Sequence, residues 1–231
     1  KINSLVMKKS FWLLILLMIF DTAISKISEA SEKYFQEIKT DIQLPKEASK
    51  DVINLFLVNS NILAVTRNGV YRFSNEKWNS KTCGTGFQTA ALDSKDNVWL
   101  ANRNSIQNEE GSVKLTLPST AKNDTILCLF WEDETLHVGT SNGMLSYNGK
   151  WQATPISQGK RVNSIALDKS GQLWLATNKG LLKRTPKEWL NLDEMIMAKG
   201  TQEIYFSLHT PKDVNDLLFS SPFSVSCIAG N

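Results

Sequence analysis

The sequence is poor in the residues that most catalytic and metal sites require. Its 231 residues include only two histidines and three cysteines. It holds no CxxC pair and no HExxH, G-x-S-x-G or P-loop pattern, so zinc, metalloprotease, hydrolase and nucleotide-binding motifs have no support. We therefore expect no metal site and no cofactor, and we predict that the protein is not an enzyme.

An excess of charge of one sign is also lacking. The chain has 26 basic and 23 acidic residues, for a net charge of +3. Nucleic-acid-binding domains normally carry a concentrated basic surface, so this balance argues against a nucleic-acid partner. A hydrophobic content of 42% and a charged content of 21% predict a folded globular protein with a sizeable core.

The three cysteines allow at most one disulfide and leave one thiol. Cys128 lies within the apolar run TILCLFW, and we interpret it as a small buried side chain. The sequence leaves the redox states of Cys83, Cys128 and Cys227 open.

The longest apolar run is short and lies near the N-terminus. From Met7 the sequence reads MKKSFWLLILLMIFDTAIS, with two lysines, ten apolar residues and then small residues two apart. These are the parts of an export signal, so we expect residues 1–25 to be a signal peptide and the protein to be periplasmic or secreted. Ten residues span about half of a bilayer, so membrane attachment through an uncleaved segment is the alternative.

A pattern of about 37 residues repeats four times. The aligned blocks are NILAVTRNGVY (61–71), NVWLANRNSIQ (97–107), TLHVGTSNGML (135–145) and QLWLATNKGLL (172–182). Their third positions, Leu63, Trp99, His137 and Trp174, lie 36, 38 and 37 residues apart. This period is typical of helical repeats or of four-stranded propeller blades.

The internal pattern favours the blades. Apolar runs of five to seven residues, rich in Val, Ile, Leu, Thr and Trp, alternate with polar turns. TRNG, TSNG and TNKG place Gly where a tight hairpin requires a positive φ, and Asp93 and Asp168 are placed to cap the preceding turns. We predict an all-β, propeller-like array of about four four-stranded blades with short helical ends. The sequence leaves open whether the ring is incomplete, as in a fragment, or is completed by the ends of the chain.

The predicted organisation has four parts. Residues 1–25 form the signal peptide, and residues 26–48 a lead with a short helix. Residues 49–190 hold the blades, at about 49–84, 85–122, 123–159 and 160–190. Residues 191–231 form an incomplete blade or begin another domain, with helices expected at 191–200 and from Thr210 and strands at 203–208 and 223–230.

One copy of the repeat resembles a known family. VNSIALDKSGQLWLATNKGL (162–181) is similar to the two-component-regulator propeller repeat, V-x-x-I-x-x-D-x-x-G-x-L-W-x-x-T-x-x-G-L. The matching residues are Val162, Ile165, Asp168, Gly171, Leu173, Trp174, Thr177, Gly180 and Leu181. The resemblance implies a periplasmic propeller, typically of seven blades, within a sensor whose ligand is an oligosaccharide.

Several residues that resemble catalytic or binding groups have simpler structural interpretations. We interpret His137, which occupies the Trp position of its repeat, as an aromatic-sized core residue. Asp93 and Asp168 recur at one phase of the repeat, which favours turn capping over glycoside chemistry. Trp78, Trp151 and Trp189 also recur, which favours packing between blades over sugar stacking.

The turns that join the second and third strands of each blade should emerge together. Their polar side chains are the candidate ligand-binding residues for a sugar or an acidic ligand: Arg67, Arg103, Asn104, Asn142 and Lys179. We predict an exported, non-catalytic recognition module, the ligand-sensing part of a two-component regulator, whose partner is an oligosaccharide or a protein. The alternatives are a propeller lyase or hydrolase acting on polysaccharide, and an extracytoplasmic protein–protein scaffold.

Overall fold

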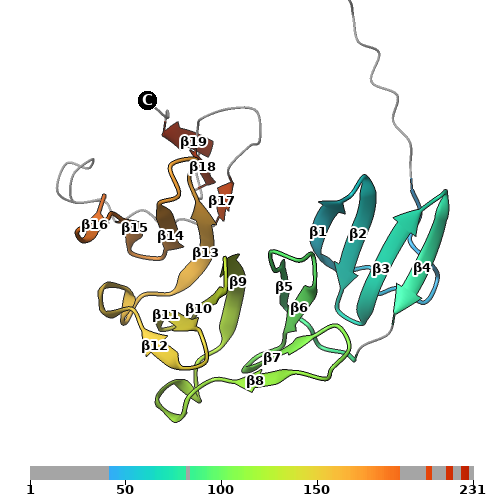
Figure 1. Ribbon diagram of the computed structural model, residues 1–231, viewed down its shortest axis with the longest axis horizontal. Helices are drawn as coiled ribbons and strands as arrows, with labels where there is room; N and C mark the ends of the chain where they lie inside the picture. The colour runs from blue at the N-terminus through green and yellow to red at the C-terminus, as the bar shows by residue number, and fades with distance from the viewer. Residues whose placement is uncertain (1–41, 82–83, 193–206, 210–216, 221–224, 229–231) are drawn as a thin grey trace, which may run out of the picture. The chain divides into compact units, whose positions relative to one another are not determined.

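Nearly all of the regular structure consists of short antiparallel strands, as the alternating apolar runs predict. The computed structural model describes residues 42–81, 84–192, 207–209, 217–220 and 225–228. These residues form four four-stranded sheets and one three-stranded sheet (Figure 1). The predicted fold class, an all-β propeller-like array of four-stranded blades, is confirmed.

Each four-stranded sheet is one repeat of the sequence. We number the blades in chain order. Blade 1 holds β1 (Val52–Val58), β2 (Asn61–Thr66), β3 (Gly69–Ser74) and β4 (Lys77–Lys81). Blade 2 holds β5 (Thr89–Leu92), β6 (Val98–Ala101), β7 (Ser105–Asn108) and β8 (Lys114–Thr116). Blade 3 holds β9 (Ile126–Glu132), β10 (Thr135–Thr140), β11 (Gly143–Tyr147) and β12 (Trp151–Ala153). Blade 4 holds β13 (Val162–Leu167), β14 (Leu173–Thr177), β15 (Gly180–Arg184) and β16 (Trp189–Asn191).

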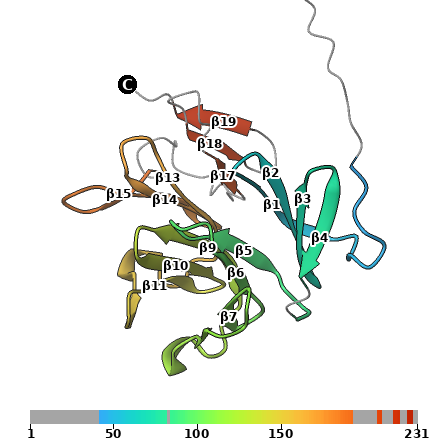
Figure 2. The same cartoon turned by 45° about the vertical axis from the view of Figure 1, so that its right-hand side comes forward.

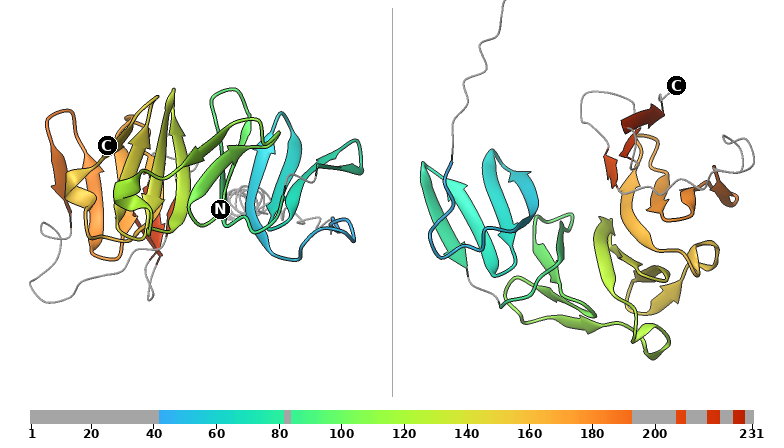
Figure 3. Two further views of the ribbon diagram at one scale, coloured as in Figure 1. Left: turned by 90° about the horizontal axis from the view of Figure 1, so that it is seen from below. Right: turned by 180° about the vertical axis from the view of Figure 1, so that it is seen from behind.

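Within each blade the strands pair with their neighbours in chain order, so every connection is a hairpin. The turn between the first two strands and the turn between the last two therefore lie at one end of the sheet. The turn between the second and third strands lies at the other end. The left panel of Figure 3 shows the sheets with turns at both of their ends. Two short 3-10 helices, η1 (Ser119–Ala121) and η2 (Pro155–Ser157), lie in the connections that follow β8 and β12.

The turn between the second and third strands is held by the threonine of the repeat. The hydroxyl of Thr177 donates to the carbonyl of Gly180 at 2.7 Å and accepts from the backbone N–H of Lys179 at 3.0 Å. Thr66 and Thr140 make the same pair of bonds in blades 1 and 3. In blade 2, where the sequence lacks the threonine, the Asn102 side chain accepts from the N–H groups of Asn104 and Ser105 instead.

The glycines of these turns differ in backbone conformation. Gly143 and Gly180 have φ values of 145° and 110°, which confirms the predicted positive φ. The prediction is wrong for Gly69, which is not in that region. A Cβ at Gly69 would lie 3.2 Å from the carbonyl oxygen of Lys81, a tight contact that a side chain could form only if this carbonyl shifted by a few tenths of an ångström.

The turn between the first two strands is held by the aspartate of the repeat, as predicted. Oδ1 of Asp168 accepts from the N–H groups of Ser170 and Gln172, and its Oδ2 accepts from the indole N–H of Trp174 at 2.8 Å. Asp93 binds its own turn and the indole of Trp99 in the same way. The Asp and Trp of the repeat are thus one structural unit.

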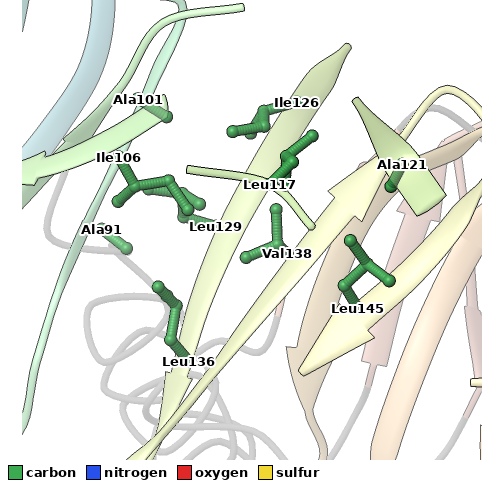
Figure 4. Close-up of a cluster of buried hydrophobic side chains, with 10 residues drawn as sticks. All are labelled: Ala91, Ala101, Ile106, Leu117, Ala121, Ile126, Leu129, Leu136, Val138 and Leu145. Carbon is green, nitrogen blue, oxygen red and sulfur yellow. The ribbon is translucent and has the colours of Figure 1, made fainter. Parts of the chain in front are cut away.

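The core lies between successive blades. One cluster of buried side chains joins blades 2 and 3 and includes Ala91 and Ile106 from blade 2 and Ile126, Leu129 and Val138 from blade 3 (Figure 4). A second cluster joins blades 1 and 2, and a third joins blades 3 and 4. The first strands of neighbouring blades also contact one another, and Figure 2 shows β5 beside β9.

Ion pairs cross the same boundaries. Arg72 of β3 makes a bidentate pair with Glu109, which follows β7 and is 5% exposed. Arg184 of β15 binds Glu132 at the end of β9. Each pair therefore links one blade to its neighbour.

The recurring tryptophans Trp78, Trp151 and Trp189 begin the fourth strands or lie one residue inside them. Trp78 and Trp151 pair across to Phe73 and Tyr147 of their own third strands, with ring centroids 5.1 and 5.0 Å apart. Trp151 and Trp189 also pack against the clusters shared by neighbouring blades, which agrees with the packing interpretation.

After blade 4, the described residues form a three-stranded sheet of β17 (Ser207–His209), β18 (Leu217–Ser220) and β19 (Val225–Ile228). Strand β17 contacts β13 and β14. The helix expected from Thr210 does not extend through Leu217–Ser220, because this apolar run pairs with both neighbours as a strand. The signal peptide, the lead helix before residue 42 and the helix expected at 191–200 lie outside the described residues, apart from Asn191 and Leu192. Asn191 ends β16, and Leu192 packs against Trp174.

Candidate functional site

The five predicted binding residues all lie in turns between second and third strands. Arg67 is in the turn of blade 1, Arg103 and Asn104 in that of blade 2, Asn142 in that of blade 3 and Lys179 in that of blade 4. All five residues are exposed. We call these four turns the turn surface; whether their side chains act on one ligand stays a prediction.

The backbone carbonyls of three of these turns accept hydrogen bonds from the chain leading into the next blade, which the sequence did not predict. The carbonyl of Arg103 accepts from the N–H of Ile126 at 2.8 Å, and the carbonyl of Asn142 accepts from the N–H of Gly159 at 3.0 Å. The carbonyl of Arg67 accepts from Gly86 at 2.8 Å. Each of these three turns is therefore hydrogen-bonded to residues that precede or begin the next blade, so contacts with two blades fix its position.

The side chains of the predicted binding residues make fewer hydrogen bonds and ion pairs than the backbone of the turns does. Arg67 pairs with Asp51 at 2.8 Å, an exposed ion pair of small energetic value. Within the described part of the chain, the side chains of Arg103, Asn104, Asn142 and Lys179 make no hydrogen bond or ion pair. Asn142 also borders a small hollow of about 150 Å³, together with Asp124 and Gln158.

A larger cavity of about 590 Å³ lies among the first strands of all four blades. Its walls combine the half-buried aromatic side chains Phe56, Phe130 and Trp131 with amide and hydroxyl groups. Among the described residues that line it there is no carboxylate, no histidine and no basic side chain. We call it the axial cavity; the sequence reasoning did not find it.

Four residues that line the axial cavity occupy one position of the repeat. Strand register pairs Asn54 with Val65, Thr89 with Ala101, Cys128 with Gly139 and Ser164 with Ala176, so each lies two residues before the partner of the repeat's Trp position. This recurrence of small polar residues is a signal that the sequence did contain. It was missed because the alignment emphasised the second strand of each blade.

Blade 3 holds a hydrogen-bonded chain of Ser146, His137 and Glu132. Nδ1 of His137 lies 2.9 Å from Oγ of Ser146, and its Nε2 lies 2.8 Å from Oε2 of Glu132. The arrangement resembles a nucleophile, base and carboxylate, but His137 is 3% exposed and lines neither of the two hollows described above. Glu132 and His137 replace the Asp–Trp unit of blades 2 and 4, which agrees with the interpretation of His137 as a core residue.

Burial and the neighbouring Arg184 set the charges of His137 and Glu132. Burial lowers the pKa of His137, and the hydrogen bond and charge of Glu132 only partly oppose this. Burial would raise the pKa of Glu132, but the hydrogen bonds from Arg184 and His137 together with their charges hold it below its usual value. A neutral His137 donating to a carboxylate and accepting from Ser146 satisfies both ring nitrogens.

This cluster predicts a loss of stability in acid. The pKa of His137 is lower in the folded than in the unfolded protein, so the unfolded state binds the extra proton as the pH falls through 6.5. Glu132 adds to the loss below pH 4.5, because its folded pKa is also depressed. Urea unfolding at pH 7.5 and pH 5.5 should give the lower free energy at pH 5.5. The His137→Gln variant should show a smaller decrease, and an equal decrease in both proteins would contradict this account.

Cys128 does not have the character of a reactive thiol. Burial raises its pKa to about 12, and Sγ lies 3.8 Å from the carbonyl oxygen of Val162. A Cβ on Gly139 would lie 2.4 Å from this sulfur, so the two residues share one tightly filled space. This agrees with the prediction of a small side chain packed inside the protein.

Within the described ranges, no group of three or more His, Cys, Asp or Glu residues is placed to hold a metal ion. No helix within the same ranges has the length and apolar character needed to span a membrane.

Comparison with solved structures defines the class of this protein as a β-propeller. The extracellular domain of BT4673, described as a one component system, from B. thetaiotaomicron matches with a TM-score of 0.62 at 16% identity over 83% of this chain and 28% of that domain. A catalytically inactive virginiamycin B lyase from Staphylococcus aureus matches with a TM-score of 0.61 at 13% identity, over 84% of this chain and 75% of the lyase. PorZ, a surface component of the type-IX secretion system of Porphyromonas gingivalis, matches at 0.56 and 14% identity over 78% of this chain and 27% of PorZ.

The sequence of one blade matches a family model. Residues 157–179 match the family model of the two component regulator propeller, so this chain carries a repeat of that family, as the resemblance predicted. No curated protein matches the chain in sequence. The chain spans 28% of the length of the BT4673 domain.

Proposed function

We propose that this chain is an exported, non-catalytic recognition module of a two-component-type sensor, and that its turn surface binds an acidic oligosaccharide. The observation that carries the proposal is that some residues of each turn stabilise the turn while others are exposed to solvent. The residues that recur, the threonine and glycine, are used in the turn's own hydrogen bonds. Arg103, Asn104, Asn142 and Lys179 vary between blades and are exposed, and their side chains make no hydrogen bond within the described ranges. The side chains of Ser141 and Asn178, which also vary, accept from the N–H groups of Thr125 and Arg161.

The chemistry of the varying residues favours an acidic ligand. Arg67, Arg103 and Lys179 are cations, and Asn104 and Asn142 add amide donors. Guanidinium and ammonium groups bind carboxylates through charge-assisted hydrogen bonds, and amides bind hydroxyl groups. A uronide oligosaccharide offers both partners. The backbone of the turns in blades 1 to 3 is also held in place, because each is bonded to the next blade, and this lowers the entropic cost of binding.

The fold supports the export and sensor parts of the proposal. Its neighbours include extracellular domains of sensor systems. Other neighbours are lyases, so the enzyme class is a rival that must be tested directly. The described lining of the axial cavity offers no carboxylate or histidine for proton transfer, which favours binding over turnover.

The proposal predicts uronide binding that depends on the turn surface. The purified chain from residue 26 should bind tri-galacturonate in isothermal titration calorimetry without cleaving it. Arg103→Ala and Lys179→Ala should each weaken binding about fivefold, because each removes a charge-assisted contact. Binding should also weaken with added salt.

Lys187→Ala is the matched control. Lys187 is exposed in the turn between β15 and β16, at the opposite end of the sheet from Lys179. This variant should bind as the unaltered protein does. Equal weakening by Lys179→Ala and Lys187→Ala would reduce the effect to net charge and overturn the turn surface. Release of unsaturated or reducing ends would support the enzyme instead.

A further inference from the structure

We infer that the axial cavity is a second binding site, separate from the turn surface, and that it binds a neutral oligosaccharide. The inference does not depend on uronide binding at the turns, because it rests on different residues and on a different chemistry.

The first argument is the form of the cavity. A volume of about 590 Å³ lies within the range of small-molecule sites in proteins. The walls come from β1, β5, β9 and β13, so the site is built on strands rather than on loops. The inter-blade clusters and the hydrogen bond from the N–H of Ala90 to Oδ1 of Asn54 at 2.8 Å hold these strands together.

The second argument is the character of the walls. Phe56, Phe130 and Trp131 line the cavity while remaining partly exposed, so aromatic surface is available to a ligand. The C–H face of a sugar ring packs on such surface. Because the described lining carries no charge, a charged ligand entering here would lose hydration without gaining a counter-ion. The cavity therefore selects against the uronides that suit the turn surface.

The third argument is the supply of hydrogen-bond donors. Oδ1 of Asn54 is used by Ala90, and its Nδ2 group makes no hydrogen bond within the described ranges. A sugar hydroxyl oxygen is a suitable acceptor for this Nδ2 group.

The test uses the purified chain from residue 26 and four neutral trisaccharides: maltotriose, cellotriose, xylotriose and mannotriose. At least one should bind in calorimetry with a Kd below 1 mM, on the scale of a few hydrogen bonds and one stacked ring. Asn54→Asp keeps the acceptor for Ala90 but removes the Nδ2 donor and adds a charge, so it should weaken binding on the order of tenfold or more. Phe56→Leu keeps the apolar volume but removes a ring from the cavity wall, and it should weaken binding about threefold to tenfold.

Asn104→Asp is the matched control, since it makes the same chemical change on the turn surface. It should leave trisaccharide binding unchanged and weaken tri-galacturonate, whereas Asn54→Asp should do the reverse. The two proposals therefore fail independently. Absence of binding by all four trisaccharides, equal effects of the two Asn variants, or tighter binding of tri-alanine than of every trisaccharide would each overturn the axial site. Near-UV circular dichroism of each variant confirms that the fold is retained.

Discussion

Replacing Trp174 with alanine is expected to lower the free energy of unfolding by about 3–5 kcal/mol, the usual cost of removing a buried Trp side chain. Trp174 is 2% exposed and packs with Ala166 and Leu192. Its indole N–H donates to Asp168, and the Lys183 ammonium lies 4.7 Å from its ring centroid. The substitution therefore leaves a large cavity and removes a partner from a carboxylate that holds the adjacent turn.

The Trp174→Phe variant separates these two effects. It keeps most of the packing and removes only the hydrogen bond to Asp168, so it should cost about 1–2 kcal/mol. Trp99→Phe should cost a similar amount, because Trp99 makes the same bond to Asp93 at 3.1 Å. Urea unfolding of the three variants provides the measurement. A cost below 1 kcal/mol for Trp174→Ala would show that the Asp–Trp unit does not stabilise the blade.

Replacing Leu129 with alanine is expected to lower the free energy of unfolding by about 2–4 kcal/mol. Leu129 lies on β9, is 7% exposed and belongs to the cluster between blades 2 and 3 (Figure 4). Its neighbours come from two sheets that are each tied by their own hydrogen bonds, so the cavity left by the substitution cannot easily collapse. Urea unfolding measures the loss, and a cost below 1 kcal/mol would contradict the packing seen between these blades.

The fold could be predicted because its determinants are local and repeated. Alternating apolar runs specify strands, and the Thr-x-x-Gly and Asp turns specify where the chain reverses. Four copies in one phase gave the number of blades. The details that were missed depend on space rather than on pattern. A side chain at Gly69 would press against the carbonyl of Lys81, a contact across strands that the sequence does not display.

Substitutions within the repeat were harder to interpret than the repeat itself. His137 was predicted to fill the place of a Trp, but its bond to Glu132 and the contact of Glu132 with Arg184 were not. Glu132 precedes His137 by five residues, whereas Asp168 precedes Trp174 by six. When His137 is aligned with Trp174, Glu132 therefore does not align with Asp168. Arg184 comes from another blade, and only the folded chain brings it to Glu132.

The candidate site was predictable only in part. Turn residues could be named because every hairpin presents its tip to solvent, and the structure places all five in exposed turns. The axial cavity was not found, because its walls are formed by side chains from four strands that lie 35 or more residues apart in the sequence. The recurrence of Asn54, Thr89, Cys128 and Ser164 at one position of the repeat was the available indication.

The central claim is that each blade buries the first strand of the next one, and blade 1 offers a control within the same chain. Leu55 occupies the position of Leu129 in its own blade, as the pairing of Leu55 with Ala64 and of Leu129 with Val138 shows. It has no such cover among the described residues and is 67% exposed.

The most direct measurement is the difference in unfolding free energy between Leu129→Ala and Leu55→Ala. The account predicts a loss of about 2–4 kcal/mol for Leu129→Ala and less than about 0.5 kcal/mol for Leu55→Ala, because only the first removes a buried side chain. Equal losses at the two positions would contradict it, since the same residue in the same strand position would then contribute equally with and without a neighbouring blade.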